Sequence, residues 1–67
     1  MMVVVYKLCS GPYDEFIGEM TRDEAMKNYV FKGAEEYNCG MYRYWEVDGY
    51  KYYDVGPITY KIAEIKK

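Results

Sequence analysis

The first twenty residues have the apolar pattern of two short strands joined by a turn. Residues 2–9 are β-branched and apolar, as in a buried strand, and the glycine and proline within residues 10–13 predict a turn. Residues 14–19 are expected to return as a second strand, with Phe16 or Ile17 facing inward and the acidic side chains facing water. This part of the chain therefore predicts a hairpin.

Residues 22–32 have the pattern of an amphipathic helix. Thr21, followed three residues later by Glu24, is a capping-box sequence. Four apolar residues then recur at helical spacing: Ala25, Met26, Tyr29 and Val30. Gly33 is expected to end the helix, because glycine readily adopts the left-handed conformation of a helix C-terminus. Residues 34–40 are expected to form a polar connection that ends in a turn.

The strongest local signal is the segment 41–55, in which aromatic and β-branched runs flank Asp48 and Gly49. It holds five of the ten tyrosines and the single tryptophan. An Asp-Gly pair between such runs predicts a two-residue hairpin turn. With that turn, six pairs of residues lie opposite one another in the two strands: Val47 with Tyr50, Glu46 with Lys51, Trp45 with Tyr52, Tyr44 with Tyr53, Arg43 with Asp54 and Tyr42 with Val55. Two pairs join opposite charges, and a one-residue slip would break both.

The two faces of this hairpin have different expected environments. We expect the core face to carry Met41, Trp45 and Val47. Because the helix can cover only one side of a sheet, the uncovered side would then gather an aromatic patch: Tyr42, Tyr44 and Tyr53, with Tyr6 or Tyr60 beside them. The structural alternative is that these tyrosines are simply good strand formers.

Residues 58–65 complete the predicted fold. Apolar residues at positions 58, 60 and 62 alternate with polar ones, which favours a half-buried strand, although Ile58, Ile62 and Ile65 also fit a helical stripe. The expected fold class is α+β: a single domain over residues 1–67, ordered β-β-α-β-β-β, with one helix packed on one face of an antiparallel sheet.

Composition limits the chemistry available to the chain. It has 67 residues and no histidine, so it can build one small core but no imidazole base or Cys-His nucleophile pair. Adjacent acids, such as Glu35 and Glu36, point apart in a strand or helix, and the isolated glycines form no phosphate-binding loop. We therefore expect neither an enzyme nor a bound cofactor.

The two cysteines and the N-terminus indicate a reducing compartment. The chain starts without a signal-peptide pattern and has no apolar stretch of about 20 residues for a membrane helix. We expect a soluble cytoplasmic protein in which Cys9 is a buried thiol and Cys39 an exposed one; a disulfide between them is the alternative. Two cysteines do not complete a zinc site, so no metal is expected.

The charge distribution favours a protein partner over nucleic acid. The net charge is −2, and five acidic side chains fall between residues 13 and 24. The leading hypothesis is a protein-binding module, an inhibitor or regulator, that uses six residues: Tyr42, Tyr44, Tyr53, Asp14, Glu15 and Glu19. Mimicry of nucleic-acid charge is a special case of it. The alternative is a single-stranded nucleic-acid binder that stacks bases on sheet tyrosines.

Two further expectations concern relatives and assembly. In its length, acidity and aromatic content, the chain resembles the small orphan proteins encoded by phages and mobile elements; this implies a non-enzymatic protein that binds a host protein. An uncovered sheet face on so small a domain also predicts a homodimer, formed through the Tyr42/Tyr44/Tyr53 face or through the strand 58–65.

Overall fold

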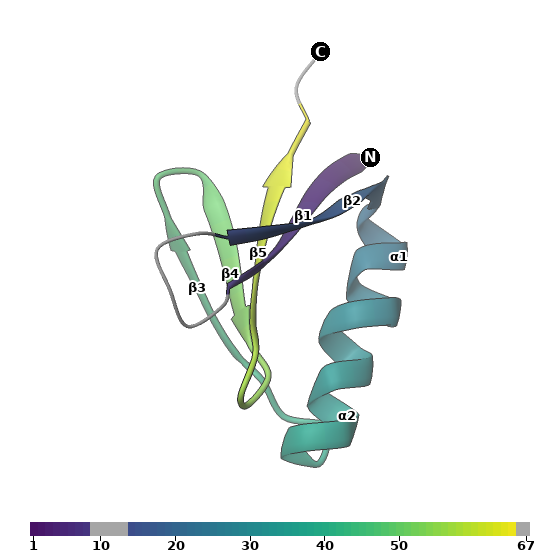
Figure 1. Ribbon diagram of the computed structural model, residues 1–67, viewed down its shortest axis with the longest axis vertical. Helices are drawn as coiled ribbons and strands as arrows, with labels where there is room; N and C mark the ends of the chain where they lie inside the picture. Colours follow the sequence, from purple (N-terminus) through teal and green to yellow (C-terminus); the bar gives the residue numbers. More distant parts are fainter. Residues whose placement is uncertain (9–13, 66–67) are drawn as a thin grey trace.

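The structure is a computed structural model that describes residues 1–8 and 14–65. These residues form an antiparallel sheet with a helix on one side. The described strands are β1 (Met2–Leu8), β2 (Asp14–Thr21), β3 (Arg43–Val47), β4 (Tyr50–Asp54) and β5 (Thr59–Glu64). Within these residues the sheet has five strands in the order β2-β1-β5-β4-β3. Figure 1 shows the helix running along one face of this sheet. The predicted β-β-α-β-β-β order and α+β class are confirmed.

The helix is continuous from Arg22 to Asn38 and has a wide middle section. Its segments are α1 (Arg22–Ala25), the π-helical η1 (Met26–Phe31) and α2 (Lys32–Asn38). Its buried residues are Ala25, Val30, Gly33 and Ala34, with Met26 and Tyr29 packed against the core. Along an ordinary helix of 3.6 residues per turn, residues spaced four apart drift progressively around the helix axis and leave the face that packs on the sheet. The wider π-turns reduce this drift, so the apolar stripe stays on the sheet.

The predicted helix start is confirmed at Thr21. Its Oγ1 accepts a hydrogen bond from the backbone N–H of Glu24, with 3.2 Å between the two atoms. The carboxylate of Glu24 accepts from the Thr21 hydroxyl at 3.0 Å and not from its amide, so one half of the capping box forms.

We predict that Thr21→Ala lowers the free energy of unfolding by about 0.5–2 kcal/mol, because it removes the acceptor for an otherwise unpaired helix amide. Urea unfolding followed by circular dichroism measures this loss. Thr21→Ser keeps the oxygen and is the matched control. Equal stability of the alanine and serine variants would show that the cap contributes nothing.

The predicted helix end at Gly33 is wrong, as is most of the predicted polar connection. The helix continues to Asn38, and Cys39, with φ of 53°, takes the left-handed C-terminal position. Gly33 instead faces the sheet, where a Cβ atom would lie 2.9 Å from Cγ2 of Val55. Cys39 is an exposed free thiol, as predicted, whereas Cys9 and the predicted turn at residues 10–13 lie outside the described residues.

The central hairpin has the predicted register. The five pairs within β3 and β4, from Val47 opposite Tyr50 to Arg43 opposite Asp54, are confirmed. Asp48 and Gly49 have φ of 52° and 82°, as a two-residue turn of mirror-image type requires. Lys51 forms its ion pair with Glu64 on β5 at 3.7 Å, rather than with the opposing Glu46.

The side of the hairpin that faces the core is the opposite of the side predicted. Met41, Trp45 and Val47 are 72%, 39% and 49% exposed, so their assignment to the core is wrong. Tyr53 is 3% exposed and Val55 is fully buried. These two residues join a core whose other members are Val3, Val5, Ala25, Val30, Ala34, Tyr60 and Ile62.

The remaining strands refine the prediction at both ends of the chain. Ile17 is half-buried against the core and Phe16 is exposed, so the inward residue of β2 is Ile17. The strand interpretation of residues 58–65 is confirmed by β5. This strand lies between β1 and β4 and pairs with both, so it has no free edge for a second chain. A homodimer in which residues 58–65 of two copies pair edge to edge is therefore excluded.

Candidate interaction surface

A row of side chains crosses the sheet on the face opposite the helix. Phe16 of β2 lies opposite Tyr6 of β1, and Tyr6 lies opposite Lys61 of β5. Lys61 in turn lies opposite Tyr52 of β4, and Tyr52 lies opposite Trp45 of β3. Directly opposed residues in antiparallel strands project from the same face. These five residues, together with Tyr50 beside them, are called the open face below.

The rings of the open face contact one another and remain accessible. Trp45 and Tyr52 are stacked, with ring centroids 5.5 Å apart and planes inclined by 5°. Tyr6 and Phe16 meet edge to face at 5.9 Å, and Phe16 is 59% exposed. An apolar patch of this kind is typical of an interaction site, and tyrosine and tryptophan are the residues that most often anchor protein interfaces.

Lys61 places one cation at the centre of this aromatic surface. Its Nζ lies 3.2 Å from Oδ2 of Asp14, 4.3 Å from the ring centroid of Tyr50 and 5.4 Å from that of Tyr6. The hydrogen bond to Asp14 raises the pKa of Lys61 above its usual value, because it stabilises the charged ammonium group. Its charge is balanced within the chain, which leaves little of it to attract a phosphate.

The other charges on this side of the sheet are mixed in sign. Glu19 lies opposite Val4, on the same side as Asp14, and Asp54 lies opposite Arg43. The carboxylate of Asp54 also accepts a hydrogen bond from the backbone N–H of Gly56 at 3.1 Å. The open face is therefore an aromatic surface with balanced charges at its border, and it is not a basic groove.

The structure separates the tyrosines that were predicted to form one patch. Tyr53 is buried beneath the helix, and burial raises its pKa. Tyr42 and Tyr44 are exposed on the helix side of the sheet, with ring centroids 5.8 and 5.1 Å from that of Tyr53. Tyr60 is also buried, so Tyr6 alone of the predicted tyrosines lies on the open face.

Tyr42 and Tyr44 form a second, smaller aromatic group with Phe31 of η1, whose ring centroid lies 6.1 Å from that of Tyr42. We call these three residues the helix-side group. The Tyr44 hydroxyl donates to the carboxylate of Glu46, and this hydrogen bond raises the pKa of Tyr44 to about 12.

The predicted acidic residues are also divided between the two sides of the sheet. Asp14 and Glu19 border the open face, whereas Glu15 is exposed next to them in the strand and points to the other side. Four aromatic residues of the open face were absent from the predicted site: Phe16, Trp45, Tyr50 and Tyr52. Their cross-strand register is the signal that places them together.

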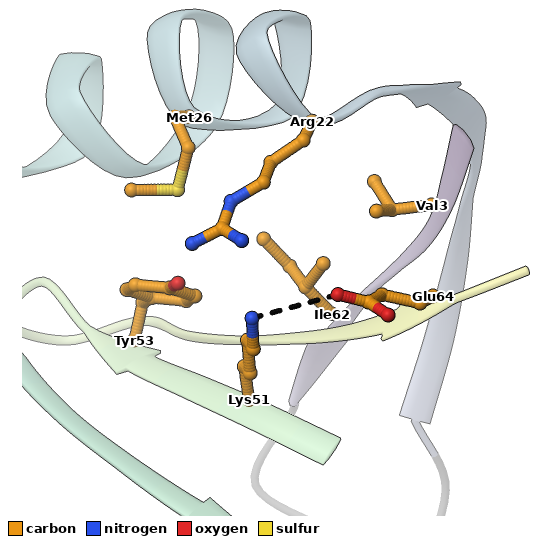
Figure 2. Close-up of a pocket in the computed structure, with 7 residues that line it drawn as sticks. All are labelled: Val3, Arg22, Met26, Lys51, Tyr53, Ile62 and Glu64. Carbon is orange, nitrogen blue, oxygen red and sulfur yellow. Dashed lines mark ion pairs between the residues drawn. The ribbon is translucent and has the colours of Figure 1, made fainter. Parts of the chain in front are cut away.

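The cavity beneath the first turns of the helix is too small for an organic ligand. Figure 2 shows Arg22 and Met26 pointing from the helix toward Tyr53, with the Lys51–Glu64 ion pair beside them. The cavity that these residues line with Val3 and Ile62 measures about 10 Å³, which is room for about one water molecule. This region is therefore part of the packed core.

Neither a cluster of metal ligands nor a membrane-spanning helix occurs within the described residues. Across residues 1–8 and 14–65, no three histidine, cysteine, aspartate or glutamate side chains are grouped as metal ligands. The helix in this part of the chain is not long and apolar enough to span a membrane. We also compared the chain with protein-family models, curated proteins and solved structures, and none of them matches.

Proposed function

We propose that this protein is a non-catalytic module that binds a larger protein through its open face. The observation that carries the proposal is the aromatic row, which crosses the sheet from Phe16 to Trp45 on the side without a helix. Large rings on adjacent strands are held by the sheet backbone, so they lose little conformational freedom when a partner covers them. An inhibitor or regulator in the cytoplasm, of the kind that phages and mobile elements encode, is the role that fits such a module.

The charges around the open face favour a protein partner with apolar and mixed-charge character. Lys61 is paired with Asp14, and acidic and basic groups both border the rings. Nucleic-acid mimicry receives less support, because it needs unpaired acids. Asp14 is in an ion pair, and Glu24 accepts the hydrogen bond from Thr21.

A second candidate function is binding of single-stranded nucleic acid. The observation that favours it is the stacked pair of Trp45 and Tyr52, because an exposed ring can continue the stack with a base. Such stacking contributes about 1–3 kcal/mol per base. The balanced charge of the surface would make this binding weak and strongly dependent on low salt.

The proposed function predicts that partner binding is lost when rings of the open face are removed. We expect Phe16→Ala and Trp45→Ala each to weaken the affinity for a captured partner at least tenfold, which corresponds to about 1.4 kcal/mol. Tyr44→Ala, which removes a comparably exposed ring from the helix side, should change the affinity less than threefold.

The experiment has a capture step and a quantitative step. This protein is immobilised and used to capture a partner protein, which is identified by mass spectrometry. The affinity of the captured partner for each variant is then measured by calorimetry. Equal weakening by Tyr44→Ala and Trp45→Ala would contradict the proposal. Fluorescence anisotropy with a labelled oligonucleotide at low salt tests the second candidate, which requires binding that weakens as salt rises.

A further inference from the structure

The two edges of the described sheet differ in how well they are protected against pairing with another strand. At the β2 edge, Val5 pairs with Gly18 but the next residue, Tyr6, pairs with Phe16, so Ile17 forms a bulge. The same strand carries exposed acids at Asp14, Glu15 and Glu19. Bulges and charges are the devices by which proteins prevent sheet edges from joining.

The β3 edge has no bulge and no net charge. Its five residues, Arg43–Val47, are all exposed and pair in unbroken register with β4. They include no proline, glycine or lysine. They carry one positive and one negative charge, which balance each other. Aromatic side chains lie on both sides of this strand, Trp45 on the open face and Tyr44 on the helix side. Such an edge is a template for another strand.

The turn fixes which backbone groups of β3 are free. In a hairpin with a two-residue loop, the residues next to the loop exchange both backbone hydrogen bonds, so Val47 bonds to Tyr50. Bonded and free positions then alternate along the strand. Tyr44 and Glu46 consequently direct their N–H and C=O groups away from β4, toward the unpaired edge.

We propose that two copies of this chain pair through β3, antiparallel, with Trp45 of one copy opposite Trp45 of the other. In this register Tyr44 of each copy lies opposite Glu46 of the other, and Arg43 lies opposite Val47. No like charges meet, and Tyr44 faces the same kind of carboxylate to which its hydroxyl already donates within the chain. The tryptophans form a cross-strand aromatic pair, which stabilises an antiparallel ladder.

The protection of β2 limits this assembly to two copies. A two-fold pairing uses β3 of both chains, so the edges left outside are the two bulged β2 strands. An isologous contact of this kind closes and does not grow into a fibre. Because the two-fold axis is perpendicular to the joined sheet, both open faces lie on the same side. The dimer would thus present two copies of the proposed binding surface to one partner.

A proline at position 46 tests the edge directly. Glu46→Pro removes an N–H that points outward, so it leaves the bonds between β3 and β4 intact, as proline permits on an edge strand. We expect light scattering to give twice the 8.0 kDa chain mass for the unmodified protein. Glu46→Thr loses the same carboxylate but keeps the outward N–H, so it is the reference for the proline variant. Glu46→Pro should raise the dimer dissociation constant at least tenfold. A monomeric unmodified protein at high micromolar concentration would overturn the proposal.

A cross-linking experiment tests the register and does not depend on the folding of the proline variant. In a background of Cys9→Ser and Cys39→Ser, Arg43→Cys and Val47→Cys are prepared as two separate proteins. Opposed residues lie about 4.5–5.5 Å apart, within disulfide range, whereas two copies of residue 43 would lie more than 10 Å apart. We expect rapid oxidation to a disulfide-linked dimer in the equimolar mixture only. Equal rates in the mixture and in the separate proteins would overturn the β3 pairing.

Discussion

Replacement of Tyr53 by alanine should lower the free energy of unfolding by about 3–5 kcal/mol, as for other large aromatic residues in cores. The same change at its neighbour Tyr52 should cost about 1 kcal/mol, the contribution of one aromatic pair. Tyr53 is 3% exposed under the helix, next to the rings of Tyr42 and Tyr44. Tyr52 is half-buried on the open face, stacked on Trp45.

The expected loss at Tyr53 is large relative to the stability of so short a chain. Domains have roughly 0.05–0.15 kcal/mol of stability per residue. Tyr53→Ala should therefore leave a substantial unfolded fraction at 25 °C, whereas Tyr52→Ala stays folded. Urea unfolding followed by circular dichroism gives both values.

Tyr53→Phe keeps the ring and is the control, with a loss of about 1 kcal/mol for the hydroxyl. Similar losses for Tyr52→Ala and Tyr53→Ala would contradict the assignment of the two faces.

The features that sequence predicted well depend on interactions between residues close in the chain. Asp48 and Gly49 can both take positive φ, and this alone sets the register from Val47–Tyr50 outward. The helix start depends on Thr21 and Glu24, three residues apart. A short span of sequence contains all the groups involved, so the local pattern is sufficient.

The buried face of the hairpin could not be predicted in this way, because it depends on strands elsewhere in the chain. Both faces of β3 and β4 carry aromatic rings, so apolarity alone does not distinguish them. The choice is made by β5: Tyr53 lies opposite the buried Tyr60, and Tyr52 lies opposite Lys61. The charged Lys61 has to stay near water, and this places Tyr52 on the open face. The register of β4 against β5 follows from the pairing of Asp54 with Thr59, and the turn at Gly56 does not specify this pairing by sequence alone.

Gly33 shows why the end of the helix was also missed. A glycine within an amphipathic pattern indicates a helix stop in one context and close packing of two elements in another. The structure shows the second case, since Gly33 is buried against Val55. What distinguishes the two cases is Val55, which is 22 positions further along the chain and joins the core only when β4 is in place.

The same close approach predicts a large effect of a side chain at position 33. Gly33→Leu should lower the free energy of unfolding by about 1–2 kcal/mol net, because overpacking a core at so close an approach costs up to about 3 kcal/mol. A Cβ atom alone would lie 2.9 Å from Cγ2 of Val55 and 3.9 Å from Cε2 of Tyr60. Val55 is fully buried, so its methyl group cannot turn out into solvent. The gain of about 1 kcal/mol in helix propensity is too small to offset this.

Two comparisons separate the steric effect at Gly33 from the helix propensity. Lys32→Leu adds the same side chain at the exposed neighbouring position and should change stability by about 0.5 kcal/mol or less. Combining Gly33→Leu with Val55→Ala removes the opposing methyl groups, so the double variant should lose less than the sum of the two single losses, by about 1–2 kcal/mol. Urea unfolding of the four proteins completes the cycle. If Gly33→Leu stabilised the protein, as propensity alone predicts, the helix could not lie as close to β4 as this packing requires.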